Sequence, residues 1–272
     1  MGTTSKTIQI PSSERTVEYT DVGSGPVIVY LHGVIKSQTD PLIDELSKSH
    51  RIVAPFLPGY GSSTGGSGLN SVHDAALHLD ETLDHLGISN AVLVGHSLGG
   101  LFAGELAAVS PRLFTHIIFI SSYGLWSNDE PTMDFFTASP KEMSKAFYSD
   151  SSLPGAINLR QSPSEEATEV DPNTEDGVKI IKRLVETAKT MSSAARYLWP
   201  IPDRGLAARL YRINRPSMVI WGENDGIIPV SYADLFAENL PDSEKVIFPE
   251  AAHMLNEEHP QQVAHVILDF IS

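Results

Sequence analysis

Cysteine is absent from this chain of 272 residues, and basic residues are few relative to acidic ones. Without a thiol the chain cannot form disulfides, use a cysteine nucleophile or bind a metal through cysteine. Nineteen Lys and Arg side chains stand against 34 Asp and Glu, which gives a formal net charge of −15. Such a charge repels the phosphates of nucleic acids, so we expect no nucleic-acid partner.

The sequence also has no long apolar run, and we expect no secretory leader. No apolar stretch approaches the roughly 20 residues that a helix needs to span a bilayer. The opening MGTTSKTIQIPS contains no basic stretch followed by an apolar run. We therefore expect a cytoplasmic protein without membrane association, a monomer or homodimer, whose partner is a small-molecule substrate.

Short, continuous apolar runs are present instead, and they indicate strands that are buried on both faces. These runs are Val27–Leu31, Arg51–Phe56, Ala91–Gly95, His116–Ser121, Ser217–Gly222 and Lys245–Pro249. Two further short strands, Thr7–Ile10 and Thr16–Thr20, flank the turn-like PSSE and predict an antiparallel hairpin.

Helical patterns separate the runs. Apolar residues recur at helical spacing from Val72 to Leu86, after the capping-box pair Ser71 and Asp74 and before Gly87, which ends the helix. The other predicted helices of this kind are Leu98–Val109, Ser231–Leu240 and Pro260–Phe270. Strand alternating with helix predicts an α/β fold with a doubly wound, mostly parallel sheet.

Residues 122–213 interrupt this alternation. They contain polar, proline-bearing turns and at least two amphipathic segments, and they contain no strand-like run. The longer segment has an apolar face formed by Val178, Ile181, Leu184, Val185 and Ala188. We predict an all-helical cap at 122–213, inserted into a core domain formed by 1–121 and 214–272.

The segment VGHSLGG, residues 94–100, follows a strand run directly and precedes a helical pattern. In this context a G-x-S-x-G pattern predicts a nucleophile elbow, in which glycines permit a sharp turn and the serine hydroxyl stands above the sheet. Ser97 is thus the candidate nucleophile. The N–H groups at the start of the following helix face any negative charge that develops beside it.

A serine nucleophile needs a base, and the base needs an acid that orients it. Asp225 and His253 follow two later strand runs, in the chain order that this kind of turn requires. Glu223 is a second candidate acid, but the turn from Gly222 to Pro229 favours Asp225. We interpret His96 and His32 as structural.

A tetrahedral intermediate also needs two backbone donors for its oxyanion. The N–H of Leu98 follows the serine directly. The N–H of Val34 follows His32 and Gly33 in the turn after Val27–Leu31, and we predict it as the second donor.

Four elements in order, HG, GHSLGG, GENDGIIP and AAH, resemble the α/β-hydrolase fold family over essentially the whole chain. PFLPGYGSS resembles the family's D-x-P-G-x-G-x-S turn, with Phe56 in place of the aspartate. The resemblance implies the serine-nucleophile branch, which is carboxylesterase-like, with a helical cap over the Ser97, His253 and Asp225 triad.

Within that family, a serine at the elbow argues against haloalkane dehalogenases and epoxide hydrolases, which use aspartate. Hydrolases that cleave carbon–carbon bonds in ring-fission products usually carry asparagine where this chain has His96. We therefore expect hydrolysis of a carboxylic ester, lactone or thioester through an acyl-enzyme, with no metal and no organic cofactor. The alternatives are a carbon–carbon bond hydrolase of ring-fission diketones, a lyase, or a ligand-binding receptor on the same fold.

Large apolar residues in and beside the cap suggest a pocket for an apolar or aromatic acyl group. The candidates are Trp126, Phe135, Phe136, Phe147, Trp199 and Met254. The alternative is that most of them form the cap's own core. Lys36 could lie at the pocket mouth and favour a carboxylate-bearing substrate, although we prefer to interpret it as a solvated loop lysine.

Overall fold

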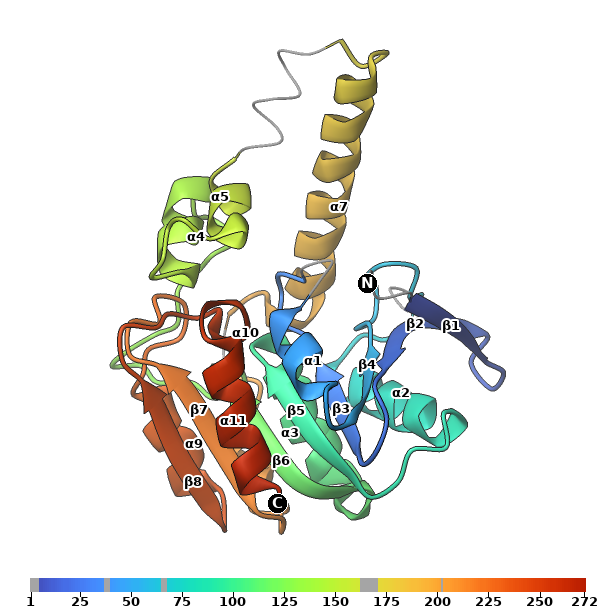
Figure 1. Ribbon diagram of the computed structural model, residues 1–272, viewed down its shortest axis with the longest axis vertical. Coiled ribbons are helices and arrows are strands. Elements are labelled where there is room, and N and C mark those ends of the chain that lie inside the picture. The colour runs from blue at the N-terminus through green and yellow to red at the C-terminus, as the bar shows by residue number, and fades with distance from the viewer. Residues whose placement is uncertain (1–4, 37–39, 65–67, 162–170, 202) are drawn as a thin grey trace.

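The computed structural model describes residues 5–36, 40–64, 68–161, 171–201 and 203–272. One eight-stranded sheet runs through the core, with strand order β1-β2-β4-β3-β5-β6-β7-β8 (Figure 1). The strands are β1 (Ser5–Ile10), β2 (Arg15–Val22), β3 (Val27–Leu31), β4 (Arg51–Pro55), β5 (Ala91–His96), β6 (Phe114–Ile120), β7 (Ser217–Gly222) and β8 (Ser243–Phe248). The β1–β2 and β2–β4 pairs are antiparallel and the other pairs are parallel. The predicted α/β class, with a mostly parallel sheet and a leading hairpin, is confirmed.

Helices cover both faces of the sheet, which explains why the strand runs are continuously apolar. In Figure 1, α1 and α11 lie on the near face, and α2, α3 and α9 lie behind. Their bounds are α1 (Pro41–Leu46), α2 (Val72–His85), α3 (Leu98–Val109), α9 (Tyr232–Asn239), α10 (Leu255–Glu258) and α11 (Pro260–Phe270). Within β5, Val92 and Val94 pack toward α1 and α11, whereas Leu93 packs toward α3.

Two features of the core differ from the sequence prediction. Strand β6 begins at Phe114, two residues before the predicted start, and its pairing with β5 shifts register between Ala91 and Val92. Helix α1 was not predicted. It is only six residues long, with Asp40 as N-cap and Pro41 in its first turn. A helix so short gives no apolar periodicity to detect.

Among the described residues, the segment between β6 and β7 contains helices and no strand. The helices are α4 (Pro140–Phe147), α5 (Pro154–Arg160), α7 (Glu175–Leu198) and α8 (Ala207–Leu210). Figure 1 shows α4 and α5 together above one end of the sheet and α7 rising beside them. The cap boundaries at residues 122 and 213 stay a prediction.

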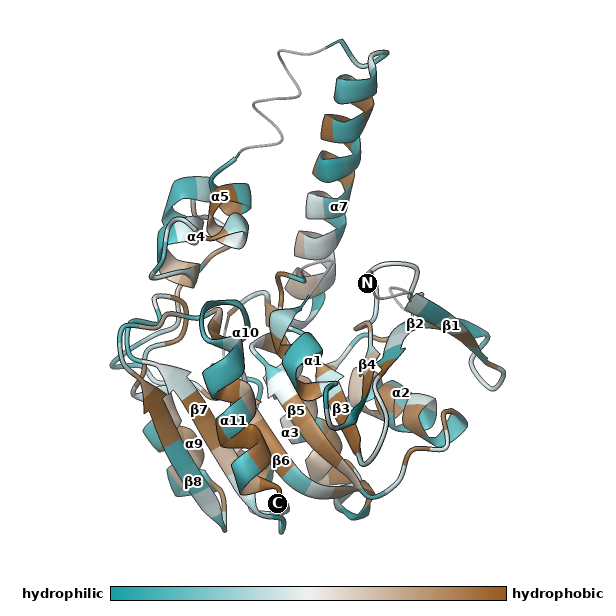
Figure 2. Ribbon diagram, viewed as in Figure 1, coloured by the Kyte–Doolittle hydropathy of each residue, from teal (hydrophilic) through white to brown (hydrophobic). Residues whose placement is uncertain are grey.

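Helix α7 is rooted at its carboxyl end and exposed along its amino half. Tyr197 is 2% exposed and its ring stands edge-on to Phe102 of α3, with 5.0 Å between centroids. Toward the other end, Val178, Ile181 and Val185 of the predicted apolar face are 38–57% exposed. Figure 2 shows the alternating apolar and polar bands of this helix. Across the ranges given above, no helix is both long enough and apolar enough to cross a membrane.

Candidate active site

Ser97 occupies a sharp turn between β5 and α3, with φ of 55° and ψ of −118°. Non-glycine residues rarely adopt a positive φ, so the turn stores backbone strain. Two glycines let the helix pack closely here. A Cβ on Gly95 would lie 2.5 Å from the carbonyl oxygen of Gly99, and a Cβ on Gly99 would lie 2.0 Å from that of Leu31. This geometry is that of a nucleophile elbow.

The structure brings Ser97, His253 and Asp225 together at the carboxyl ends of parallel strands. Nε2 of His253 lies 2.8 Å from Oγ of Ser97, and Nδ1 lies 2.8 Å from Oδ2 and 3.1 Å from Oδ1 of Asp225. An ionised carboxylate can only accept, so Nδ1 carries the proton and Nε2 is free to accept from the serine hydroxyl. The arrangement can therefore remove a proton from Ser97.

The loop after β7 turns Asp225 inward and Glu223 outward. Oδ1 of Asp225 accepts hydrogen bonds from the N–H groups of Ile227 and Ile228, both at 2.9 Å. These bonds fix the carboxylate so that its other oxygen faces His253. Glu223 is exposed, and of the two acids only Asp225 is hydrogen-bonded to the imidazole.

The two backbone donors named in the sequence lie beside Ser97. Leu98 is the first residue of α3, so its N–H has no acceptor within the helix. The turn after β3 passes directly over the serine, since a Cβ on Gly33 would lie 3.0 Å from Cβ of Ser97. Val34 follows in that turn and is 1% exposed. The placement suits an oxyanion hole made by Leu98 and Val34.

The two histidines that we interpreted as structural are buried and neutral. His32 accepts at Nε2 from the N–H of Leu57 (3.0 Å) and donates from Nδ1 to the carbonyl of Gly33 (2.8 Å). Nε2 of His96 lies 3.0 Å from the backbone oxygen of His253. Burial lowers the pKa of each of these two imidazoles to about 3.

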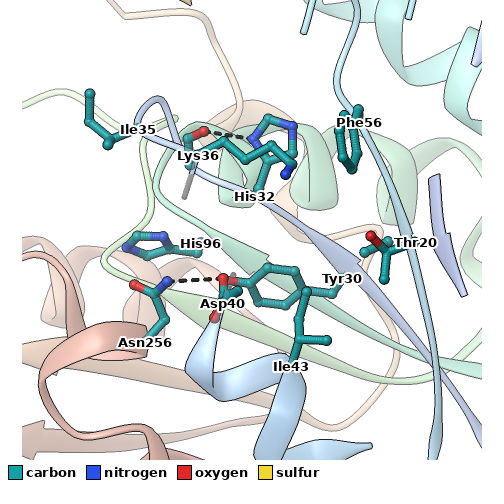
Figure 3. Close-up of a pocket in the computed structure, with 12 residues that line it drawn as sticks. Thr20, Tyr30, His32, Ile35, Lys36, Asp40, Ile43, Phe56, His96 and Asn256 are labelled. Carbon is teal, nitrogen blue, oxygen red and sulfur yellow. Dashed lines mark hydrogen bonds between the residues drawn. The ribbon is translucent and has the colours of Figure 1, made fainter. Parts of the chain in front are cut away.

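The candidate nucleophile is enclosed. Ser97 is 1% exposed and His253 is fully buried. A cavity of about 30 Å³, lined in part by Gly33 and His96, lies beside them (Figure 3). Figure 3 shows His96 and Asn256 on one side of this cavity and Phe56 on the other. A substrate carbonyl therefore reaches Ser97 only if neighbouring side chains move.

Sequence reasoning missed the polar part of this cavity. Asp40 accepts from the hydroxyl of Tyr30 (2.8 Å), the side-chain amide of Asn256 (3.0 Å) and the N–H of Leu42 (3.0 Å). Burial raises the pKa of Asp40 to about 6, although these hydrogen bonds oppose the shift. An aspartate followed by proline is typical of a helix start. Nothing in that pattern indicates that its carboxyl group is buried.

A much larger cleft, of about 1330 Å³, lies between α4, α5 and α7. Its apolar walls include Met143, Leu153, Leu159, Ile181, Val185 and Met191. Ile35 and Lys36, which follow Val34 in the turn after β3, line both this cleft and the small cavity beside Ser97. The cleft is large enough to hold an acyl group.

The six residues predicted for the pocket line neither space. Phe147 stands edge-on to His253, and rings then continue outward through Phe135 and Phe136 to Trp199, with centroids 4.2–6.2 Å apart. Met254 is 1% exposed, and its N–H donates to the carbonyl of Phe147. The indole of Trp126 donates to Asn128, and Trp199 is half exposed. In this conformation these six side chains pack against each other and against their neighbours.

Lys36 is not a solvated loop residue as we preferred to interpret it. Its Nζ lies 3.7 Å from the centroid of the Phe56 ring, so the residue that replaces the expected aspartate faces a cation. Burial lowers the pKa of the Lys36 ammonium, and the nearby carboxylates of Glu18 and Asp40 oppose that shift. A cation held here can attract an anionic group of a substrate.

The chain is similar in sequence to known proteins over most of its length. The sequence model of the alpha/beta hydrolase fold matches residues 26–260 of this chain. The uncharacterized hydrolase YugF of Bacillus subtilis is 26% identical, over 90% of this chain and 89% of that protein. A 2-hydroxy-6-oxononadienedioate/2-hydroxy-6-oxononatrienedioate hydrolase of Comamonas testosteroni is 25% identical, over 100% of this chain and 97% of its own length.

Among solved structures, a putative lipase from Acinetobacter baumannii AYE superposes with a TM-score of 0.73. It is 20% identical, and the match covers 99% of this chain and 91% of the lipase chain. At that identity the likeness concerns the fold alone.

Proposed function

Because the chain belongs to the α/β-hydrolase fold family, we propose that it is a serine hydrolase that cleaves the carboxylic ester of a small, largely apolar substrate. A lactone or thioester would undergo the same chemistry. The observation that carries this proposal is the continuous hydrogen-bond path from Ser97 through His253 to Asp225. Burial of all three groups strengthens their mutual electrostatic interactions.

In the first step Oγ of Ser97 attacks the ester carbonyl carbon while Nε2 of His253 accepts the hydroxyl proton. The carbonyl oxygen becomes an oxyanion, which accepts hydrogen bonds from the N–H groups of Leu98 and Val34. The C–O bond to the alcohol then breaks, and the alcohol leaves with the proton from His253. An acyl-enzyme on Ser97 remains.

In the second step His253 removes a proton from water, which attacks the acyl carbon. The bond between the acyl carbon and Oγ of Ser97 then breaks, the acid leaves, and His253 returns the proton to Oγ. Asp225 keeps the proton of the neutral imidazole on Nδ1 and stabilises the imidazolium that forms in each step. Ile227 and Ile228 hold this carboxylate, so it can act without changing its orientation.

The cleft between α4, α5 and α7 favours a substrate with an apolar acyl group. Its walls include side chains such as Ile181 and Val185, which are 38% and 57% exposed and have apolar surface available for a ligand. Lys36, which also lines the cleft, suits a substrate that carries an anionic group.

Turnover of p-nitrophenyl esters of increasing acyl length tests the proposal. We expect wild-type hydrolysis that exceeds that of Ser97→Ala by about three orders of magnitude or more. A fluorophosphonate should label the wild type and leave Ser97→Ala unlabelled. Ser110→Ala, at the other end of α3, is the matched serine control and should behave as the wild type. If the wild type is no faster than Ser97→Ala on every ester and lactone, the proposal is wrong.

A second candidate is hydrolysis of a carbon–carbon bond in a ring-fission diketone. The full-length similarity to the Comamonas testosteroni hydrolase favours it, and Lys36 could face the carboxylate of such a substrate. The ratio of kcat/KM for a ring-fission diketone to that for the best ester decides between the two. A ratio above one favours carbon–carbon cleavage, and binding of both compounds without turnover favours a receptor.

A further inference from the structure

His96 is joined directly to the backbone of the candidate base. The two residues lie 157 positions apart in the chain, yet Nε2 of His96 is 3.0 Å from the backbone oxygen of His253. Their rings are 5.4 Å apart and tilted, and both ring nitrogens of His253 already have partners in Asp225 and Ser97. His96 ends β5 and is 1% exposed, which places this contact inside the protein.

The protonation state of His96 follows from its partner. A backbone carbonyl can only accept, so Nε2 of His96 must carry the proton and donate it. Burial and, after it, the proximity of His253 lower the pKa of His96 to about 3, so the ring stays neutral. Nδ1 is then an unprotonated atom that faces Gly33, where a Cβ would lie only 3.0 Å away.

Two other hydrogen bonds flank His253 in the loop that carries it. The N–H of Met254 donates to the carbonyl of Phe147, and the N–H of Ala252 donates to Glu258. Both bonds hold the residues on either side of His253. The bond from His96 is made to the carbonyl oxygen of His253 itself, and that carbonyl is attached to the Cα that carries the imidazole.

We propose that His96 is a positioning residue, whose Nε2–H holds the backbone of His253 so that the imidazole stays aligned between Ser97 and Asp225. The inference rests on the proposed role of these three residues. Alignment matters because catalysis by a general base depends on sub-ångström placement of the accepting nitrogen. The sequence pattern around His96 indicates only a packing role.

Two substitutions separate the hydrogen bond from the shape of the ring. His96→Phe keeps a planar ring and removes the donor. His96→Gln places an amide N–H at about the same reach from the backbone and restores a donor. His78 is a matched control, because it is also a buried histidine but lies in α2, and burial lowers its pKa to about 4.

For His96→Phe we expect kcat to fall on the order of 10- to 100-fold, with KM changed less than about twofold. The rate of fluorophosphonate labelling at Ser97 should fall by a similar factor. His96→Gln should recover most of both rates, and His78→Phe should leave both unchanged. Equal losses in the Phe and Gln variants, or a loss that appears only in KM, would overturn the inference.

Long-range ¹H–¹⁵N spectra of the histidine side chains give a readout that needs no turnover. We expect His96 as the Nε2–H tautomer, and a single Nδ1–H state of His253 that becomes heterogeneous in His96→Phe and is restored in His96→Gln. If His96 carries its proton on Nδ1, or if the His253 signals are identical in all variants, the inference fails. These spectra decide the point even if no ester is hydrolysed, in which case only the proposed function fails.

Discussion

The ring of Phe147 stands edge-on to the imidazole of His253, with centroids 5.2 Å apart and an interplanar angle of 87°. The same stretch of α4 is bonded to both loops of the site. The carbonyl of Phe147 accepts from Met254, and the carbonyl of Ala146 accepts from Gly226. Helix α4 therefore helps to hold the two loops that carry the candidate base His253 and the candidate acid Asp225.

Phe147→Ala should lower both stability and rate. The side chain is 1% exposed, and truncating a buried phenylalanine costs about 3–5 kcal/mol of unfolding free energy. Loss of the ring also lets the imidazole of His253 tilt, so we expect kcat to fall about 10-fold. Urea denaturation and ester turnover, measured well below the melting temperature, check the two effects. Phe147→Leu should retain most of the stability and most of kcat. An unchanged kcat in Phe147→Ala would show that the ring contributes to packing and not to the placement of His253.

Asp225→Asn should lower kcat by about 10³- to 10⁴-fold, because an amide at this position no longer selects the Nδ1–H tautomer of His253. Glu223→Gln is the matched control two residues away, and it should stay within about twofold of the wild type since Glu223 is exposed. Steady-state kinetics on the best ester measure both. The opposite ranking of the two variants would show that the acid assignment is wrong.

The strands and the order of the candidate groups could be predicted because they depend on local patterns. Continuous apolar runs predicted six of the strands to within a few residues, and the turn-like PSSE between two short strands predicted the leading hairpin. The glycines around Ser97 predicted the elbow because a Cβ at either Gly95 or Gly99 would clash with backbone. Asp225 could be preferred to Glu223 from the turn sequence alone.

The pocket could not be predicted in the same way, since it depends on how helices far apart in sequence face each other. Phe135 and Phe136 are apolar and aromatic whether they line a cavity or fill one, and here they stack on each other at 4.2 Å. The exposure of Val185 follows from α7 extending beyond the core. The carboxyl group of Asp40 is buried through contacts with Tyr30 and with Asn256, which lies 216 positions away.

Arg209→Met should strongly destabilise the protein. Glu105 of α3 is fully buried, and Arg209 of α8 binds its carboxylate through two nitrogens, at 2.7 and 2.5 Å. Without the guanidinium, His73, 3.6 Å away, is the one ion-pair partner of this buried charge that remains among the described residues. We expect a loss of about 3–5 kcal/mol in the free energy of unfolding.

The double substitution Glu105→Leu with Arg209→Met removes both charges and tests the reason for that loss. It should cost less than Arg209→Met alone, because no uncompensated charge is left in the interior. Chemical denaturation of the single and double variants gives the coupling energy. Additive losses would mean that packing of the arginine stem, and not its charge, supports this contact.

Stability should fall as the pH rises from about 4 to about 6, through the carboxyl group of Asp40. Its pKa is raised to about 6 in the folded protein, against an ordinary value of 3.8. Between these two values the folded state holds a proton that the unfolded chain has released, so the unfolding free energy decreases with increasing pH. A shift of this size corresponds to at most about 3 kcal/mol, and partial exposure of the residue reduces it.

Asp40→Asn isolates this contribution, since asparagine also caps helices well and cannot ionise. Rotation of the Asn256 amide would turn its oxygen, which is buried and has no hydrogen-bond partner, toward the introduced amide group. We therefore expect similar stability for variant and wild type near pH 4, and a more stable variant at pH 7. Urea denaturation across this range measures the difference, with Asp44→Asn in the same helix as a control. A difference that is constant with pH would exclude Asp40 as the titrating group.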